Sequence, residues 1–311
     1  MLEIFKTLET GELQGLKVIE KGCWINMYAP TKDEIEKIQR EVGIIPNFIL
    51  DPLDDEEKPH IDVEDDQTLV IVDVPYVVED EGIQKFETMP MGIIIKEEII
   101  ITVSLRKNDI IEIIKNNRLK EFFTFKHTRF TFQILFVASK EYLRLLRLID
   151  KKTEEAERTL LKSMKNKELF MVLQLEKSLV FFATSLKSNE MVMERLLRGK
   201  SLKKYEEDQD LLEDVIIENK QAIEMANIYS SILSSMMSAF ASIISNNLNM
   251  VMKFLTSITI VLAIPTMISS FFGMNVGVPW QGSIIGFIFV VAMSIVGSGV
   301  AFIFLWKKDM F

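Results

Sequence analysis

One long uncharged stretch decides the fold. Residues 254–306 read FLTSITIVLAIPTMISSFFGMNVGVPWQGSIIGFIFVVAMSIVGSGVAFIFLW and contain no Asp, Glu, Lys, Arg or His. A single helix of that length would extend roughly 80 Å, whereas the hydrocarbon layer of a membrane is only ~30 Å thick. The stretch therefore predicts two membrane-spanning helices, at about 251–272 and 284–306, joined by a loop at 273–283 that carries glycines, a proline and polar side chains.

The lysines around this stretch predict its orientation. Lys253, Lys307 and Lys308 flank the two spans, and the connecting loop has no positive charge. Because short cytoplasmic segments carry the excess of Lys and Arg, both termini are expected in the cytoplasm and the loop outside. The N-terminus lacks the apolar core of a signal peptide. We therefore expect a multi-pass protein of the cell (inner or plasma) membrane with a cytoplasmic N-terminal part.

The segment just before the first span is also uncharged, but it is rich in Ser and Asn. Its apolar residues recur in steps of three and four, which is the pattern of a helix that packs against other helices. They are Tyr229, Leu233, Met236, Phe240 and Ile243. We expect a stalk helix at about 205–250 that packs against copies of itself and continues unbroken into the first span. A third transmembrane helix within 225–252 is the alternative.

Small and polar residues form a stripe along the first span. Steps of three and four place them on one helical face. They are Asn249, Met252, Thr256, Thr259, Ala263, Thr266 and Ser270. Such a stripe serves either close helix packing or a water-lined path. Two helices cannot enclose a pore, so the second interpretation requires several subunits.

The rest of the chain has an α+β pattern. We expect an α/β cytoplasmic domain at 1–127, long helices including the stalk at 128–249, and the transmembrane hairpin at 250–311. Three strands are predicted, at Cys23–Tyr28, Thr68–Val77 and within Met91–Ser104, and Thr31 or Asp33 is expected to cap a helix that runs to about Val42. Breaks near 164–167 and 199–201 separate the long helices.

Composition excludes several functions. A net charge of −9 argues against a nucleic-acid partner. One cysteine and two histidines rule out a disulfide framework and disfavour a Cys/His zinc site. We find no phosphate-binding glycine loop, nucleophile elbow or His/carboxylate constellation. The chain is therefore expected to be neither an enzyme nor the holder of an organic cofactor.

Acidic residues gather in one part of the N-terminal domain. They are Asp51, Asp54, Asp55, Glu56 and Glu57, followed by Asp62, Glu64, Asp65 and Asp66. A solvated loop accounts for them. A site for a hard cation is the alternative, since Mg²⁺ and Ca²⁺ prefer carboxylate oxygens.

The order of these parts and the tripeptide Gly273-Met274-Asn275 resemble the CorA family of magnesium channels. The tripeptide lies at the outer end of the first of two C-terminal spans, where the family has it. The resemblance extends along the chain, through Trp24-Ile25-Asn26, the segment 250–256 and Pro265. It implies a homopentameric funnel in the lipid bilayer that transports Mg²⁺.

The resemblance also implies roles for individual residues. Gly273, Met274 and Asn275 would form the selectivity filter. Within such a pore, Met252 and Leu255 are our candidates for a hydrophobic constriction, and packing of Met252 is the alternative. Asp51 and Asp214 would hold a regulatory Mg²⁺ between subunits. The loop at 276–283 departs from some relatives because it carries no acid.

The expected function is Mg²⁺ influx driven by the membrane potential, with Co²⁺ and Ni²⁺ as further cargo, gated by cytoplasmic Mg²⁺. Two alternatives remain. One is a transporter of zinc or another divalent metal on the same scaffold. The other is a membrane-anchored, non-conducting sensor or scaffold, which would have a uniformly apolar first span.

Overall fold

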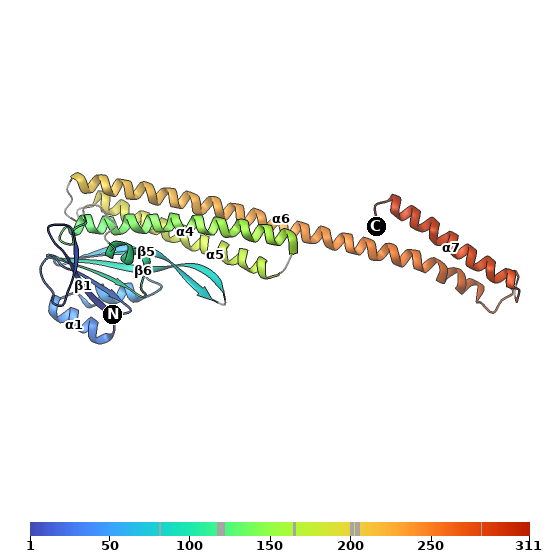
Figure 1. Cartoon of the computed structure of the whole chain (residues 1–311), viewed down its shortest axis with the longest axis horizontal. Helices are drawn as coiled ribbons and strands as arrows, with labels where there is room; N and C mark the ends of the chain where they lie inside the picture. Colours follow the sequence, from blue (N-terminus) through green and yellow to red (C-terminus); the bar gives the residue numbers. More distant parts are fainter. Residues whose placement is uncertain (81, 117–121, 164–165, 200–201, 203–205, 281) are drawn as a thin grey trace. The chain divides into compact units, whose positions relative to one another are not determined.

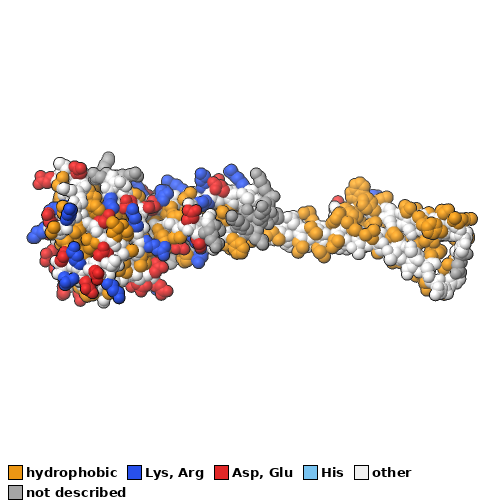
Figure 2. Space-filling model, turned by 60° about the horizontal axis from the view of Figure 1, so that its bottom comes forward, with side chains coloured by type: hydrophobic (Ala, Val, Ile, Leu, Met, Phe, Trp, Pro, Cys, Tyr) orange, Lys and Arg blue, Asp and Glu red, His pale blue; other side chains and the backbone are white. Residues whose placement is uncertain are grey.

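The computed structural model describes residues 1–311 except 81, 117–121, 164–165, 200–201, 203–205 and 281. The chain divides into two compact units, Met1–Ser234 and Ser235–Phe311. Figure 2 shows charged side chains spread over the first unit, whereas the second is largely apolar or uncharged. This segregation explains how a chain with 26% charged residues reaches a mean hydropathy of +0.19.

A seven-stranded mixed sheet organises the first unit (Figure 1). The strands follow the order β2-β1-β3-β7-β6-β5-β4, and β3 pairs with β7 in parallel while the other neighbours are antiparallel. Their bounds are Leu2–Thr7 (β1), Leu13–Leu16 (β2), Trp24–Tyr28 (β3), His60–Glu64 (β4), Gln67–Asp80 (β5), Ile83–Lys96 (β6) and Ile99–Ser104 (β7).

The predicted strands are present, but one run holds parts of two strands. Met91–Ser104 contains the end of β6 and all of β7. The chain reverses at Glu97, which has a positive φ of 47°. The two glutamates at 97 and 98 are the charged break in an otherwise apolar run, and they mark this tight turn.

Short helices cover one face of the sheet. Helix α1 (Lys32–Val42) begins with a capping box between Thr31 and Glu34, so Thr31 is the cap. Helix α2 (Pro46–Leu50) runs into the 3₁₀ helix η1 (Asp51–Leu53). Their side chains build one core with the sheet; it includes Ile38, Phe48, Ile49, Leu69, Ile71 and Ile94.

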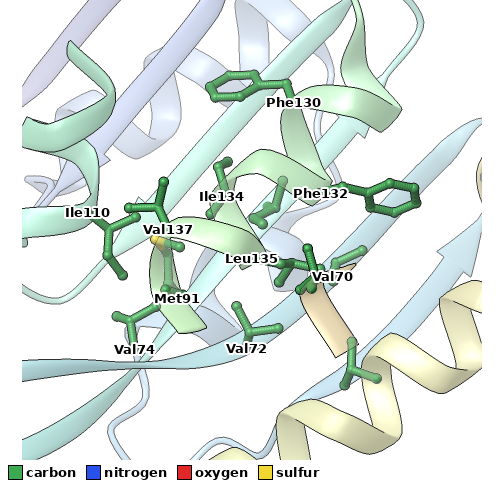
Figure 3. Close-up of a cluster of buried hydrophobic side chains, with 14 of the residues drawn as sticks. Val70, Val72, Val74, Met91, Ile110, Phe130, Phe132, Ile134, Leu135 and Val137 are labelled. Carbon is green, nitrogen blue, oxygen red and sulfur yellow. The ribbon is translucent and has the colours of Figure 1, made fainter. Parts of the chain in front are cut away.

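Helices α3 (Asp109–Lys115), α4 (His127–Ser163), α5 (Asn166–Arg198) and the first part of α6 (Glu206–Phe272) contribute to a second core. Figure 3 shows part of it, where Val70 of β5 lies beside Leu135 of α4, and Val74 lies beside Met91. Alternate residues of β5 enter the two cores, and successive side chains of a strand point to opposite faces. The two helical layers therefore lie on opposite faces of the sheet.

Helix α5 is long and apolar enough to cross a membrane, as are α6 and α7 (Ile284–Lys307). Its packing places it in the first unit, because Val172, Leu175, Leu179, Phe182 and Leu186 are buried. A polar residue of α5 also forms hydrogen bonds with the main chain of the sheet.

Strand β5 pairs with β4 as far as Ile71. Beyond this residue, β5 forms hydrogen bonds with a side chain of α5. The Asn189 side chain accepts a hydrogen bond from the Asp73 amide and donates one to the Asp73 carbonyl, each at 2.8 Å. The same carbonyl accepts a second hydrogen bond, 3.2 Å long, from the Tyr142 hydroxyl. Helix α5 is therefore held to the strand by hydrogen bonds from the Asn189 side chain to the main chain as well as by apolar packing.

The predicted helix breaks fall partly outside the described residues. The structure does not describe residues 164–165, between α4 and α5. It also leaves out most of 199–205, before α6. Beyond them α6 is unbroken from Glu206 to Phe272, which confirms the stalk that continues into the first span. A separate third span within 225–252 would need a turn on each side, so the structure does not support it.

Candidate pore and cation sites

The second unit is a hairpin of α6 and α7, and one face of α6 packs on α7. Ser257 is fully buried, and Val261, Ile264, Pro265 and Ile268 are half-buried. A methyl group on Gly297 of α7 would come within 3.0 Å of Ile264 Cγ2. The two helices therefore approach closely where α7 has glycine.

A proline in α6 is compensated from α7. Pro265 has no N–H to donate to the carbonyl of Val261, four residues earlier. The Ser298 hydroxyl of α7 donates to this carbonyl at 3.2 Å. In a membrane such a freed carbonyl must find a partner within the protein, and a neighbouring serine is a suitable one. Sequence reasoning assigned no role to Ser298, since the contact depends on the register of the hairpin.

The predicted polar stripe lies on the other side of α6. All of its members are exposed, namely Asn249, Met252, Thr256, Thr259, Ala263, Thr266 and Ser270. Leu255, the other residue of the predicted constriction, is exposed as well. A shallow groove of about 580 Å³ runs along part of this face, lined by Thr259, Leu262, Ala263, Thr266, Met267 and Ser270. The stripe is thus not used for packing against α7, and a wet path along it would need other copies of the chain.

The threonine hydroxyls of the stripe are oriented by the helix. Thr259 Oγ1 donates to the Leu255 carbonyl at 2.8 Å, and Thr266 Oγ1 donates to the Leu262 carbonyl at 3.2 Å. A hydroxyl has one proton to give and two lone pairs. Because the proton is committed to the helix, these oxygens present acceptor sites to water or to a hydrated cation.

The Gly273-Met274-Asn275 turn follows directly on the end of α6. The Gly273 amide donates to the Ser269 carbonyl at 2.9 Å and continues the last helical turn. Met274 and Asn275 are exposed. The last carbonyls of a helix carry partial negative charge, which favours a nearby cation. Residues 254–306 contain no carboxylate, so these dipoles and the Asn275 side chain are neutral groups that can attract a cation at this end of the hairpin.

The loop after the turn is fixed on α7. The Trp280 ring packs against the Phe289 ring in a tilted arrangement, with ring centroids 5.1 Å apart. Ser283 caps α7 by accepting a hydrogen bond from the Ile285 amide at 3.2 Å. Gly286 allows the Trp280 backbone to approach, because a Cβ there would lie 2.7 Å from the Trp280 carbonyl oxygen.

Aromatic side chains close the opposite end of the hairpin. Phe302 packs on Trp306 and on Phe311, and Phe254 of α6 also contacts the Phe311 ring. The Ser257 hydroxyl donates to the Met310 carbonyl at 2.9 Å. The C-terminal residues therefore pack back onto α6, one turn from Met252 and Leu255.

Asp51 lies at the junction of α2 and η1 and is partly buried. Burial raises the pKa of its carboxyl, and the nearby charges of Glu57, Asp62 and Asp54 raise it further, while His60 opposes them. The acidic residues around Asp51 therefore form one negatively charged surface. The sequence placed them in one acidic run but did not show which of them face Asp51.

The structure does not bring Asp51 and Asp214 together within one chain. Asp51 lies on the α1–α2 side of the sheet, whereas Asp214 is an exposed residue of α6 beside Leu212 and Val215 of the other core. Among the described residues, no three His, Cys, Asp or Glu side chains are grouped to hold a metal. A site with both carboxylates would have to form between chains.

Comparisons with known proteins agree with these features. The model of the family described as CorA-like Mg²⁺ transporter protein matches residues 20–308. A relative called cobalt/magnesium transport protein CorA, from Methanocaldococcus jannaschii, is 30% identical over 283 residues, which cover 88% of this chain and 86% of the relative. A protein of the same description from Thermotoga maritima is 19% identical over 275 residues, 87% of this chain and 78% of that protein.

Solved structures show the same fold. The complete structure of the CorA magnesium transporter from Methanocaldococcus jannaschii superimposes with a TM-score of 0.82 at 26% identity, over 99% of this chain and 96% of that one. The full-length CmaX protein has a TM-score of 0.69 at 14% identity, over 99% and 97% of the two chains, and shares the fold alone.

Proposed function

We propose that this chain, which belongs to the CorA-like Mg²⁺ transporter family of ion transporters, conducts Mg²⁺ into the cell through a pore formed by several copies of itself. The observation that carries the proposal is the exposed stripe of α6, which presents hydroxyl oxygens on the face opposite α7. Likeness to the family supports a homopentamer. In this organisation residues 1–127 and 128–249 lie in the cytoplasm, and 250–311 form the membrane hairpin.

The selectivity filter would be a ring of neutral oxygens at the outer mouth. Asn275 from each copy supplies an amide oxygen, and the carbonyls near Gly273 and Met274 supplement it. Mg²⁺ loses its water shell reluctantly, so neutral acceptors can hold the hydrated ion through its waters. A ring of carboxylates would bind the ion harder and slow its release.

Below the filter, the hydroxyls of Thr256, Thr259, Thr266 and Ser270 would line the wet path. Met252 and Leu255, both more than half exposed in the single chain, would form a constriction that closes by excluding water. This constriction lies near Lys253, at the cytoplasmic end of the proposed topology.

The membrane potential suffices to drive entry. A divalent cation gains about 4.6 kcal/mol per 100 mV, which is twice the figure for one charge. With both termini in the cytoplasm, as Lys253, Lys307 and Lys308 indicate, inward flow is favoured without ATP. Co²⁺ and Ni²⁺ are expected as further cargo.

Gating would follow from linkage to cytoplasmic Mg²⁺. A Mg²⁺ ion between Asp51 of one copy and Asp214 of the next would stabilise the closed packing. Without the ion, the two carboxylates and the acids around Asp51 repel one another, so the closed state loses support.

The decisive experiment measures divalent-cation flux into proteoliposomes. Asn275→Ala should reduce the Mg²⁺ flux several-fold and change the order of preference among Mg²⁺, Co²⁺, Ni²⁺ and Zn²⁺. Val276→Ala is the matched control, because it shortens the neighbouring exposed side chain without removing an oxygen. A flux of Zn²⁺ that exceeds that of Mg²⁺ would favour a zinc transporter. No flux from folded wild-type protein, at any internal Mg²⁺ concentration, would eliminate the channel.

A further inference from the structure

The 3₁₀ helix η1 lies directly against the backbone of the sheet. Pro52 of η1 is buried over Gly92, a residue of β6 that pairs with Ile71 of β5 and Val103 of β7. A Cβ on Gly92 would overlap Cγ of Pro52 and lie 2.9 Å from its Cβ. Non-bonded carbon atoms are favourably separated by about 3.5–4.0 Å. Glycine is therefore required at position 92 if η1 is to occupy this place.

The requirement is one of space and not of backbone conformation. Gly92 is not among the described glycines with a positive φ, and β6 pairs on both sides at this position. An alanine here could adopt the strand conformation. Among the residues that the structure describes, the obstacle is the pyrrolidine ring of Pro52, and Leu69 Cδ1 lies at an ordinary contact distance of 3.5 Å.

Pro52 immediately follows Asp51, so its position sets that of the carboxylate. On the preceding side, Phe48 and Ile49 of α2 are buried in the core. The Asp51 amide donates to the Asn47 carbonyl, and the Asp51 carbonyl accepts from the Asp54 amide at 3.0 Å. The contact between Pro52 and Gly92 holds the chain in place on the C-terminal side of Asp51.

Electrostatic repulsion acts against this position. Glu57, Asp62 and Asp54 carry the same charge as Asp51 and lie close enough to repel it where it now lies. A segment held only by loop contacts could relieve the repulsion by moving into solvent. The packed proline prevents that movement, and it keeps the acids together when no cation is bound.

We propose that Gly92 and Pro52 form a seat that holds Asp51 at the position from which it binds the regulatory cation, so that Gly92 is a positioning residue for cation sensing. The inference rests on the proposed sensing role of Asp51. It adds a residue of the central sheet, remote in sequence from the acids, to the machinery that sets the response to Mg²⁺.

The test measures how internal Mg²⁺ inhibits flux through the full-length protein in proteoliposomes. Gly92→Ala should raise the Mg²⁺ concentration for half-inhibition by about tenfold, within the usual range of coupling between sites. Pro52→Gly should raise it by a smaller factor, because it empties the seat. The double variant should approach the wild type, because the alanine methyl replaces the ring. Gly15→Ala, in a strand where a Cβ would meet nothing within 4 Å, should leave the response unchanged.

A double-mutant cycle with Asp51→Asn separates an effect on the position of Asp51 from a general loss of stability. In an Asp51→Asn background, Gly92→Ala should not shift half-inhibition further, because it acts through Asp51. An equal shift in both backgrounds would overturn the inference. So would a Gly92→Ala protein that unfolds at a lower temperature but keeps the wild-type Mg²⁺ response.

The outcome for Asp51→Asn alone distinguishes this inference from the proposed function. If that variant keeps wild-type inhibition, the sensing role fails and the inference fails with it. If it shifts half-inhibition while neither Gly92→Ala nor Pro52→Gly does, only the inference fails. Pro52→Gly introduces no overlap, so it tests the seat even if Gly92→Ala does not fold.

Discussion

The Ser298 hydroxyl on α7 donates a hydrogen bond to the Val261 carbonyl of α6, the carbonyl that Pro265 leaves without an amide partner. The bond holds the hairpin at the point where α6 lacks one of its own main-chain bonds. The missing main-chain bond lies on the side of α6 that faces α7, away from the polar stripe. The stripe therefore keeps its regular helical spacing.

Ser298→Ala should therefore destabilise the hairpin by about 1 kcal/mol, which is a usual contribution of a hydrogen bond between membrane helices. In a Pro265→Ala background the loss should nearly vanish, because the new amide supplies the missing donor. Unfolding of the detergent-solubilised chain by increasing denaturant measures both values. Ser294→Ala is the control, since Ser294 donates to Val290 within its own helix. Equal losses in both backgrounds would contradict this account.

Met252→Ser should increase flux at high internal Mg²⁺ several-fold. A hydroxyl in the proposed constriction would keep it wet when the channel is closed. Met250→Ser makes the same change two residues away, on a different face of α6, and should leave the closed-state flux low. Equal closed-state leaks through the two variants would remove Met252 from the gate.

Asp214→Lys should weaken inhibition by internal Mg²⁺, because in the proposed site the lysine would supply a permanent cation opposite Asp51 of the neighbouring copy. Flux at low Mg²⁺ should fall toward that of the inhibited channel, and its dependence on Mg²⁺ should flatten. Glu213→Lys makes the same change of charge at the adjacent exposed position of α6 and should have a smaller effect. Wild-type inhibition in the Asp214→Lys channel would exclude this residue from sensing.

Inhibition by Mg²⁺ should also weaken in acid. The pKa of Asp51 is raised above its ordinary value of 3.8 by burial and by neighbouring acids, so protons compete with the cation at a higher pH than for a solvated aspartate. The Mg²⁺ concentration for half-inhibition should rise as the pH falls toward the raised pKa, and Asp51→Asn should remove this dependence. Without Mg²⁺ the folded state holds this proton more tightly, so its stability should increase over the same fall in pH.

Asn189→Ala should lower the free energy of unfolding by about 2 kcal/mol. It leaves the Asp73 amide of β5 without its hydrogen-bond acceptor in a partly buried place, whereas the Asp73 carbonyl keeps the Tyr142 hydroxyl. Asn116→Ala, which removes an exposed bond to the Glu112 carbonyl, should cost much less. Thermal unfolding of the full chain compares the two variants, and equal losses would show that the pairing of Asn189 with β5 contributes little.

The sequence predicted the elements whose signals are local. Thr31, one of the two caps predicted for the first helix, is the cap of α1, and the 254–306 stretch required a hairpin whatever its partners. The unbroken α6 followed from the steady spacing of its apolar residues. The α+β fold with apolar C-terminal helices is confirmed by its likeness to the CorA structure.

Features that depend on distant parts of the chain were not predictable in this way. The parallel pairing of β3 with β7 joins segments that lie far apart in the sequence. The placement of Asp51 and Asp214 on opposite faces of the sheet follows from which β5 side chains enter each core. No spacing rule connects Gly92 to Pro52, or Ser298 to Pro265, because each contact exists only after strands or helices have packed.

The inward bonding of Thr259 and Thr266 has a consequence for anions. Both hydroxyl protons are donated to carbonyls of α6, so these side chains offer electron pairs and no hydrogen to whatever passes along the stripe. Chloride requires hydrogen donors to replace its waters, and it would find none on these two hydroxyls. In the proposed pore, a wall of this kind would discriminate by the sign of the charge although it carries no charge itself.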